Sequence, residues 1–256
     1  MPVKKENASI LQSVDNAFRL LELFKTKEEL GVTQISQELK IAKSSAFRLL
    51  NTLKEWKYVT KNEETDQYRL GIQFAVWGEI AKSRNVLVSA AKPYLVDLAL
   101  QVREISYLTI LEDDFHVRFI DKVADSSRTA LFGSQIGNTM PAYCTASGKA
   151  MLAFLPNERQ EEYFRIANLI ELTPKSITDV DTLKKQLKEI KVKGYSFDDE
   201  ESEQGLSCYA TPIINLAGDV VAAVSVSGPT GRITLDSEEK IKLLKETAQK
   251  IVNEIK

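Results

Sequence analysis

Residues able to do covalent or metal chemistry are few in this sequence. It contains two cysteines, Cys144 and Cys208, and one histidine, His116. A structural zinc site needs about four closely spaced Cys or His ligands, so we expect no metal site. A Ser-His-Asp apparatus would have to use His116, which lies in an alternating stretch with no nucleophile motif nearby. We therefore predict no catalytic residue and no cofactor, and expect that the protein is not an enzyme.

The two cysteines leave one chemical alternative open. A reactive thiol at Cys144 or Cys208 would make the chain a cysteine-based redox sensor or a small-molecule enzyme. A free cysteine also occurs as a small buried hydrophobic residue, and the residues around Cys208 by themselves favour that interpretation.

Length and composition restrict the class of protein. The chain has 256 residues, of which 43% are hydrophobic and 27% are charged, as in folded globular proteins. Its apolar stretches, such as Val220–Val224, are far shorter than the roughly 20 residues of a membrane span. The N-terminal residues lack the apolar core of a secretory signal. We expect one large domain or two modest ones, a cytoplasmic location and no membrane partner.

Basic residues concentrate in one segment of a chain whose net charge is −2. Residues 40–61 hold six lysines or arginines and a single acidic residue, Glu55. Apolar spacing predicts helices at 13–25, at 33–40 with Thr33 as its cap, and from Ser44 to about 55. A short helix, a three-residue turn and a longer helix with basic and hydroxyl residues at its start is the arrangement of a helix-turn-helix. The alternative is that the basic residues only solvate a small helical bundle.

A predicted hairpin follows this third helix. Residues 58–61 and 67–70 read as two strands, and residues 62–66 read as the turn between them. The hairpin supplies a wing, so we interpret residues 10–70 as a winged helix-turn-helix that binds double-stranded DNA.

The third helix presents a polar face that supplies the predicted DNA contacts. Ser44, Ser45 and Arg48 are predicted to reach base edges, and Arg48 can make a two-pronged contact with guanine. Lys43 and Lys61 are predicted to meet phosphates. Phe47 lies at the edge of the face, where it either packs on the first helix or contacts a thymine methyl group.

A connecting helix is predicted at 72–84. Phe74 and Trp77 on its surface need something to cover them, so the helix contributes either to a dimer contact or to domain packing. A dimer would suit a twofold-symmetric operator, since two recognition helices about 34 Å apart read its two half-sites.

The remaining sequence alternates between predicted strands and helices. A helix near 86–102 contains Pro93, which is expected to kink it or to reset its start. The predicted strands are 106–111, 117–123, 128–133, 195–198, 207–214 and 219–227. The predicted helices are 146–154, 157–167, 179–193 and 237–255. This order predicts an α+β domain with a mostly antiparallel sheet of about six strands.

Several stretches resemble the signatures of IclR-family transcriptional regulators. They are Ala142–Pro156 (AYCTASGKAMLAFLP), Gly194–Ile213 and Ala223–Pro229. The segment Ile41–Leu53 (IAKSSAFRLLNTL) is similar to the recognition region of the same family. The resemblance extends over essentially the whole chain.

The resemblance implies a two-domain α+β fold and a regulatory function. The expected domains are a winged helix-turn-helix at 1–71, a linker helix at 72–85, and an effector-binding and oligomerisation domain at 86–256. The sheet of the last domain is expected to be similar to GAF and profilin folds. The implied function is ligand-responsive regulation, more often repression, of a catabolic operon by a homodimer or a tetramer made of two dimers.

The resemblance also implies an effector pocket in the C-terminal domain. Its expected lining residues are Asp198, Cys208, Ser225, Ser227, Ala146, Ser147, Phe132, Met140 and Leu206. A helix that begins at Ala146 offers unpaired backbone N–H groups to a carboxylate, and Ser225 and Ser227 face one side of a strand. The pocket is therefore expected to bind a small organic acid.

Asp198 is the unusual member of this set, since a carboxylate repels an anionic ligand. It is expected to accept hydrogen bonds from ligand hydroxyl groups, such as those of a sugar acid. The neighbouring Asp199, Glu200 and Glu201 are expected to form a solvated acidic turn. A 2-keto-3-deoxy sugar acid, an aromatic acid and a short keto acid all remain open as ligands.

Overall fold

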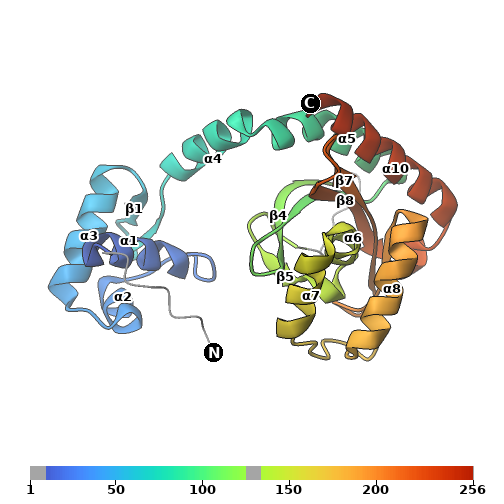
Figure 1. Cartoon of the computed structure of the whole chain (residues 1–256). Coiled ribbons are helices and arrows are strands. Elements are labelled where there is room, and N and C mark those ends of the chain that lie inside the picture. The colour runs from blue at the N-terminus through green and yellow to red at the C-terminus, as the bar shows by residue number, and fades with distance from the viewer. Residues whose placement is uncertain (1–9, 125–133, 256) are drawn as a thin grey trace. The chain divides into compact units, whose positions relative to one another are not determined.

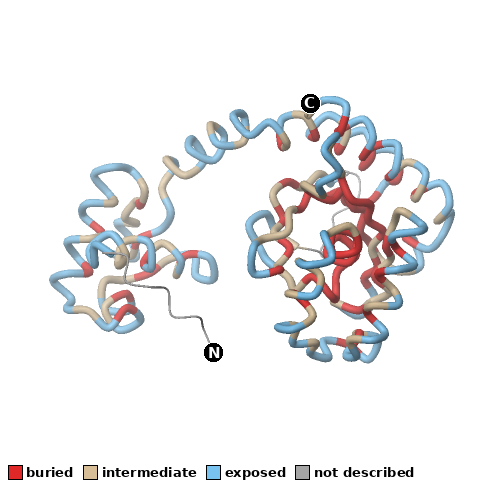
Figure 2. Tube along the Cα trace, viewed as in Figure 1, coloured by how far each residue is buried: buried red, intermediate tan, exposed pale blue. Residues whose placement is uncertain are grey.

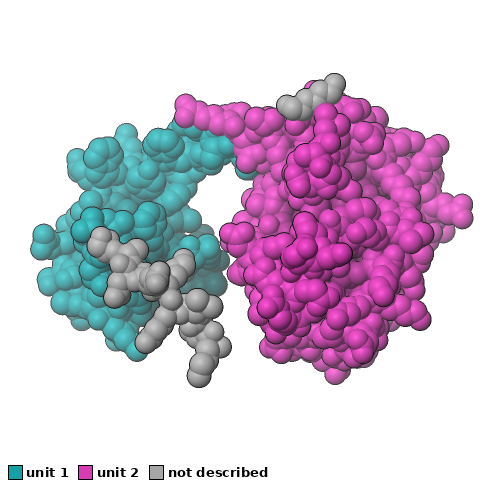
Figure 3. Space-filling view, in the orientation of Figure 1, with its two compact units in different colours: residues 1–82 teal, residues 83–256 magenta. Residues whose placement is uncertain are grey.

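The computed structural model describes residues 10–124 and 134–255, and the chain divides into two compact units, residues 1–82 and 83–256 (Figure 3). The division falls within helix α4 (Gln73–Arg84), which occupies most of the expected linker. No helix in the described part of the chain is long and apolar enough to span a membrane.

The first unit contains three helices and a hairpin in the predicted order. The elements are α1 (Gln12–Leu23), α2 (Val32–Leu39), α3 (Lys43–Glu55), β1 (Val59–Asn62) and β2 (Gln67–Leu70). Their apolar faces meet in one core that includes Leu20, Ile35, Leu50 and Tyr68, all almost completely buried. Backbone hydrogen bonds between Leu30 and Tyr68 attach the hairpin to the segment before α2.

The start of α2 differs from the prediction. Thr33 does not cap the helix, which begins at Val32. The N–H of Gly31 donates to the side chain of Gln34 at 2.8 Å, and this bond satisfies a backbone donor at the helix start.

The second unit is built on an antiparallel sheet, in which the described residues form six strands in the order β5-β4-β3-β8-β7-β6. The strands are β3 (Ile105–Leu111), β4 (His116–Val123), β5 (Thr139–Pro141), β6 (Ser196–Asp199), β7 (Leu206–Ile214) and β8 (Val220–Pro229). The predicted strand at 128–133 lies outside the described residues. β5, which the sequence analysis missed, pairs with β4 at the sheet edge.

Helices cover both faces of this sheet, and the buried residues gather between the layers (Figures 1 and 2). On one face, α5 (Val86–Val102) and α10 (Ser237–Glu254) enclose a core with β3, β7 and β8. The other elements are the short helix η1 (Ala142–Cys144), α6 (Ala146–Phe154), α7 (Asn157–Ile166), α8 (Val180–Lys193) and α9 (Thr230–Ile233). Of these, α6, α7 and α8 contribute to a second core with β3 and β4.

Pro93 does not reset the start of α5, so that part of the prediction is wrong. The helix begins at Val86 and continues past the proline to Val102. Its start is fixed one residue earlier, where the side chain of Asn85 accepts a hydrogen bond from the N–H of Val88 at 3.0 Å.

Candidate functional site

The exposed face of α3 is the first candidate site. Lys43, Ser44, Ser45, Phe47 and Arg48 are all exposed there, and Phe47 keeps 48% of its surface accessible. The buried Ala46 and Leu50 hold the opposite face in the core. No side chain of a described residue caps the helix, which leaves the N–H groups of its first turn without a side-chain acceptor at the positive end of the helix dipole. This face can therefore receive phosphate and base acceptors.

Lys61 lies in a different environment. On β1 it lies on the same face of the strand as the buried Val59, two residues earlier, and its cross-strand partner is the buried Tyr68. Its ammonium group forms an ion pair with Asp66 at the turn of the hairpin. Lys61, which was predicted to contact a DNA phosphate, is thus already paired with a carboxylate in this structure.

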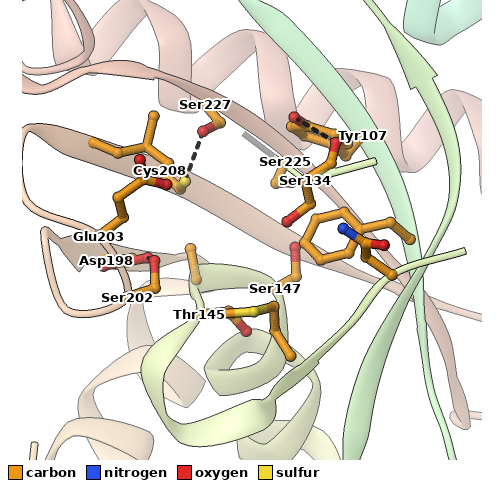
Figure 4. A pocket seen from close by; sticks show the side chains of 15 residues that line it. Tyr107, Ser134, Thr145, Ser147, Asp198, Ser202, Glu203, Cys208, Ser225 and Ser227 are labelled. Atoms are coloured by element: carbon orange, nitrogen blue, oxygen red, sulfur yellow. Dashed lines mark hydrogen bonds between the residues drawn. The ribbon is translucent and has the colours of Figure 1, made fainter. Parts of the chain in front are cut away.

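The second candidate site is a cavity of about 240 Å³ between the sheet and the start of α6 (Figure 4). Phe132 lies outside the described residues. The other expected effector residues all line this cavity: Met140, Ala146, Ser147, Asp198, Leu206, Cys208, Ser225 and Ser227. The residues that the sequence analysis missed are Tyr107, Phe119, Ser134, Asn138, Thr145, Ser202 and Glu203.

Strand register explains why distant residues meet at the cavity. Asp198 on β6 pairs with Cys208 on β7, which pairs with Ser227 on β8. Ser225, two residues before Ser227, pairs with Tyr107 on β3. Side chains of residues paired across antiparallel strands point to the same face of the sheet. These polar side chains therefore lie side by side and form one wall of the cavity. The Cys208 thiol donates to the Ser227 hydroxyl at 3.0 Å.

The start of α6 forms the opposing wall. The Thr145 hydroxyl caps the helix by accepting from the N–H of Gly148 at 3.0 Å, which leaves the amides of Ala146 and Ser147 outside the helical pattern. A Cβ at position 148 would lie 2.3 Å from the carbonyl oxygen of Ala142, so only glycine permits this approach of α6 to the preceding turn. Thr145 is therefore a pocket residue that its capping position before the Ala-Ser-Gly run could have revealed.

Two buried hydroxyl groups in the cavity have no hydrogen-bond partner among the described residues. Ser147 on α6 and Ser225 on β8 are each 3% exposed, and neither side chain forms a hydrogen bond with a described residue. Both belong to the cavity walls, and Figure 4 shows them directed into the space between helix and sheet. Buried polar groups are normally hydrogen-bonded, so this pair indicates a place for water or for a polar ligand.

Asp198 is 1% exposed and already bonded within its own loop. One carboxylate oxygen accepts from the N–H of Glu201 at 2.7 Å, and the other accepts from the hydroxyl of Ser202 at 2.9 Å. Burial, reinforced by the nearby carboxylate of Glu201, raises the pKa of Asp198 to about 7. The side chain therefore shapes the β6–β7 loop, and the raised pKa brings its titration toward neutral pH.

Glu201 contradicts the prediction of a solvated acidic turn. It is 4% exposed and forms an ion pair with Lys149 of α6, which is completely buried. The ammonium of Lys149 also donates to the carbonyl oxygen of Phe197 at 2.7 Å and to the side chain of Gln186 at 3.2 Å. A buried carboxylate needs such a partner, and the cation comes from a helix that is distant in the sequence. Asp199 and Glu200 keep more exposure and share the ammonium of Lys175.

The environment of the thiols argues against the reactive-cysteine alternative. Burial raises the pKa of Cys144 to about 12, and burial also raises the pKa of Cys208. A reactive cysteine needs a lowered pKa because the thiolate is the nucleophile. His116 is not among the residues that line the cavity. The described residues contain no cluster of three or more metal-ligating side chains.

The chain matches two families along most of its length. Residues 13–63 match the IclR helix-turn-helix domain, and residues 79–253 match the family described as bacterial transcriptional regulator IclR C-terminal. The transcriptional regulator KdgR of Escherichia coli strain K12 is 31% identical over 242 residues, which span 94% of this chain and 91% of KdgR. XynR from the same organism is 32% identical over 225 residues, 88% of each chain.

Solved structures agree with these matches. The Thermotoga maritima IclR structure superimposes with a TM-score of 0.82 at 31% identity, over 95% of this chain and 98% of that one. A regulator from Rhodococcus sp. RHA1 gives a TM-score of 0.87 at 28% identity, over 96% and 98%. The fold and its relatives define a DNA-binding transcriptional regulator rather than an enzyme. The chain belongs to the IclR family.

Proposed function

We propose that this regulator represses a catabolic operon, and that a small organic acid bound in the cavity of the second unit changes its affinity for DNA. The observation that carries the proposal is the wall of α6, where free backbone amides and the unpartnered Ser147 face the equally unpartnered Ser225. Such donors suit a carboxylate. The ligand acts by favouring one of two arrangements that differ in DNA affinity.

Relatives support both halves of this proposal. YiaJ of E. coli K12, which is 31% identical to this chain, is a DNA-binding transcriptional repressor, and IclR of the same strain, at 29% identity, is a transcriptional repressor. An IclR homologue from Microbacterium hydrocarbonoxydans, which shares the fold at 22% identity, has been crystallised with 4-hydroxybenzoate. The polar lining of the present cavity favours a hydroxylated acid. The proposed assembly is a cytoplasmic homodimer or a dimer of dimers.

A fluorescence-anisotropy titration tests the proposal. The protein is titrated with its own upstream intergenic DNA and with a scrambled duplex, with and without a panel of sugar, keto and aromatic acids. We expect the upstream DNA to bind ~10³-fold more tightly, as specific regulators do, and one class of acid to collapse that ratio. A protein that selects no sequence even from a random pool would contradict the proposal.

A matched pair of serine variants locates the ligand. Ser225→Ala removes an unpartnered hydroxyl from the cavity, whereas Ser207→Ala removes one on β7 that is bonded to Thr230. Ser225→Ala is expected to weaken ligand binding about 10- to 150-fold and to leave DNA affinity unchanged, since one hydrogen bond to a charged group contributes about 1.5–3 kcal/mol. Ser207→Ala is expected to change neither. An unaltered ligand titration for Ser225→Ala would remove the cavity from the mechanism.

A further inference from the structure

An open basic groove in the first unit lies apart from the residues predicted to read bases. Its lining residues come from the C-terminal end of α3, the hairpin and the residues leading into α4. Lys54, Lys57 and Arg69 line it together with the half-buried Thr60, and none of the residues that line it is acidic. We infer that this groove binds backbone phosphates of the operator, next to the segment that α3 reads; the inference rests on the proposed DNA-binding face of α3.

The three cations are available for an external anion. Each is exposed, and none forms an ion pair with a described residue. The pKa of Glu29 is lowered mainly by hydrogen bonds that its carboxylate accepts from Asn62 and Thr65. The charge of Arg69 makes only a minor contribution to that shift. Three unpaired cations around an open groove favour an extended anion, and the phosphate backbone of DNA is one.

The groove continues the DNA-facing surface of α3. Lys43, Phe47 and Lys54 lie four and eleven residues apart, which places them on one flank of the helix. Eleven residues span about 16 Å along a helix. A backbone that passes Lys43 at the start of α3 can therefore reach the groove at its end.

Backbone contacts fix the floor of the groove. Lys57 adopts a left-handed conformation, and its N–H donates to the carbonyl of Lys54 at 2.9 Å. The N–H of Gly71 donates to the carbonyl of Tyr58 at 2.8 Å, and a Cβ on Gly71 would lie 2.1 Å from the carbonyl oxygen of Lys57. The backbone from which Lys57 projects is thus held in place by hydrogen bonds and by the close approach of Gly71.

The turn of the hairpin is unsuited to the same task. It carries Glu63, Glu64 and Asp66, all exposed, and Asp66 occupies the ammonium of Lys61. Carboxylates at this tip repel phosphates, whereas the flank of the hairpin at Arg69 attracts them. The wing is therefore expected to approach DNA with its flank rather than with its tip.

The salt dependence of DNA binding tests the inference. The triple variant Lys54→Gln, Lys57→Gln, Arg69→Gln is compared with a control that removes three charges elsewhere in the same unit, Arg19→Gln, Lys25→Gln, Lys27→Gln. Each phosphate contact contributes about 0.9 to the slope of log K against log salt. We expect the glutamine variant to reduce the magnitude of that slope by about 2 to 3 for each protein chain whose DNA-binding unit is bound to the duplex. The loss should be equal on operator and scrambled DNA, so that their affinity ratio stays the same.

Charge-preserving variants and thermal melts complete the design. Lys54→Arg, Lys57→Arg and Arg69→Lys together are expected to keep the wild-type slope, and all variants are expected to melt at the wild-type temperature. A wild-type slope in the glutamine variant, or an equal flattening in the control, would overturn the phosphate groove. Wild-type protein that binds no DNA would instead defeat the proposed function itself, so the two failures are distinguishable.

Discussion

At the residue scale, Arg48 is the side chain on which base recognition is expected to depend. It is exposed on the polar face of α3, and its guanidinium forms no hydrogen bond or ion pair with a described residue. A two-pronged contact with guanine contributes about 1–3 kcal/mol of discrimination. Arg48→Ala should therefore reduce the affinity ratio of operator to scrambled DNA by about 5- to 150-fold per half-site.

The control for this variant is Arg19→Ala, which removes an exposed arginine from α1. Anisotropy titrations at matched salt should show an unchanged ratio for Arg19→Ala and an unchanged melting temperature for both variants. An Arg48→Ala protein that keeps full operator preference would remove this residue from base recognition.

Asp198 is expected to make ligand binding sensitive to pH. Its pKa of about 7 results first from burial and then from Glu201, against the opposing effect of Lys149. Below that pH the carboxyl is neutral, and above it the charge repels a carboxylate ligand. The affinity for an acid that is fully ionised throughout should fall as the pH rises from 6 to 8, by up to about tenfold per unit above the pKa.

Calorimetric titrations at three pH values check this expectation. Asp198→Asn removes the titrating group, so its ligand affinity should stay constant over the same range. The free energy of unfolding is expected to decrease with rising pH as well. The folded-state pKa lies above the ordinary value of 3.8, so the folded protein binds more protons between about pH 4 and 7. The contribution of Asp198 to the free energy of unfolding therefore decreases as the pH rises through that window. An equal pH dependence in the Asn variant would place the titration elsewhere.

At the element scale, the Lys149–Glu201 pair joins α6 to the β6–β7 loop, whose residues Ser202 and Glu203 line the cavity. Lys149→Met leaves Glu201 buried without its cation, and breaking a buried pair costs about 3–5 kcal/mol. The double variant Lys149→Met, Glu201→Gln removes both charges and should recover most of that loss.

The measurement must report on the second unit. Both tryptophans, Trp56 and Trp77, belong to residues 1–82, so calorimetry or far-UV circular dichroism is preferable to tryptophan fluorescence. The exposed pair Lys193 and Glu189 on α8 supplies the control, because Lys193→Met breaks a surface pair that contributes little. Similar losses for the two single variants would contradict the role of burial.

Local sequence patterns predicted some elements of the fold, whereas the Lys149–Glu201 pair could not be predicted from them. Periodicity located α3 and the hairpin within a few residues, because each is defined by local spacing and turn composition. The burial of Glu201 depends on Lys149, which lies 52 residues away, and a run of four acidic residues gives no local sign of that contact. Strand β5 escaped notice for a related reason: it has three residues, ends at Pro141, and exists through its pairing with β4.

Some residues of the candidate cavity were predicted from the sequence, and others depend on tertiary contacts. Its expected members came from the resemblance to a family and from the two-residue alternation of Ser225 and Ser227. Tyr107 joins them through its register with Ser225, which no local pattern reveals. Ser202 and Glu203 belong to a loop whose course is set by the bonds to Asp198, so their place at the cavity is a tertiary property.

At the scale of the whole molecule, the exposed apolar side chains on and beside α4 require a covering surface. Ile72, Val76 and Trp77 are 71%, 45% and 51% exposed, and no residue of α4 is buried in the described chain. Apolar patches of this kind mark interaction sites. A second copy of the chain is the expected partner, because a twofold-symmetric operator requires two recognition helices.

Replacing Val76 and Trp77 with glutamate should therefore shift the protein toward monomer in sedimentation velocity. The control replaces Val192 and Leu216, which are 89% and 78% exposed in the other unit, and should leave the sedimentation coefficient unchanged. Two linked binding units gain about 10²- to 10⁴-fold in avidity, so the monomeric variant should lose at least ~100-fold in affinity for a full operator but little for a half-site. A variant that remains dimeric and binds the full operator normally would assign the dimer contact to another surface.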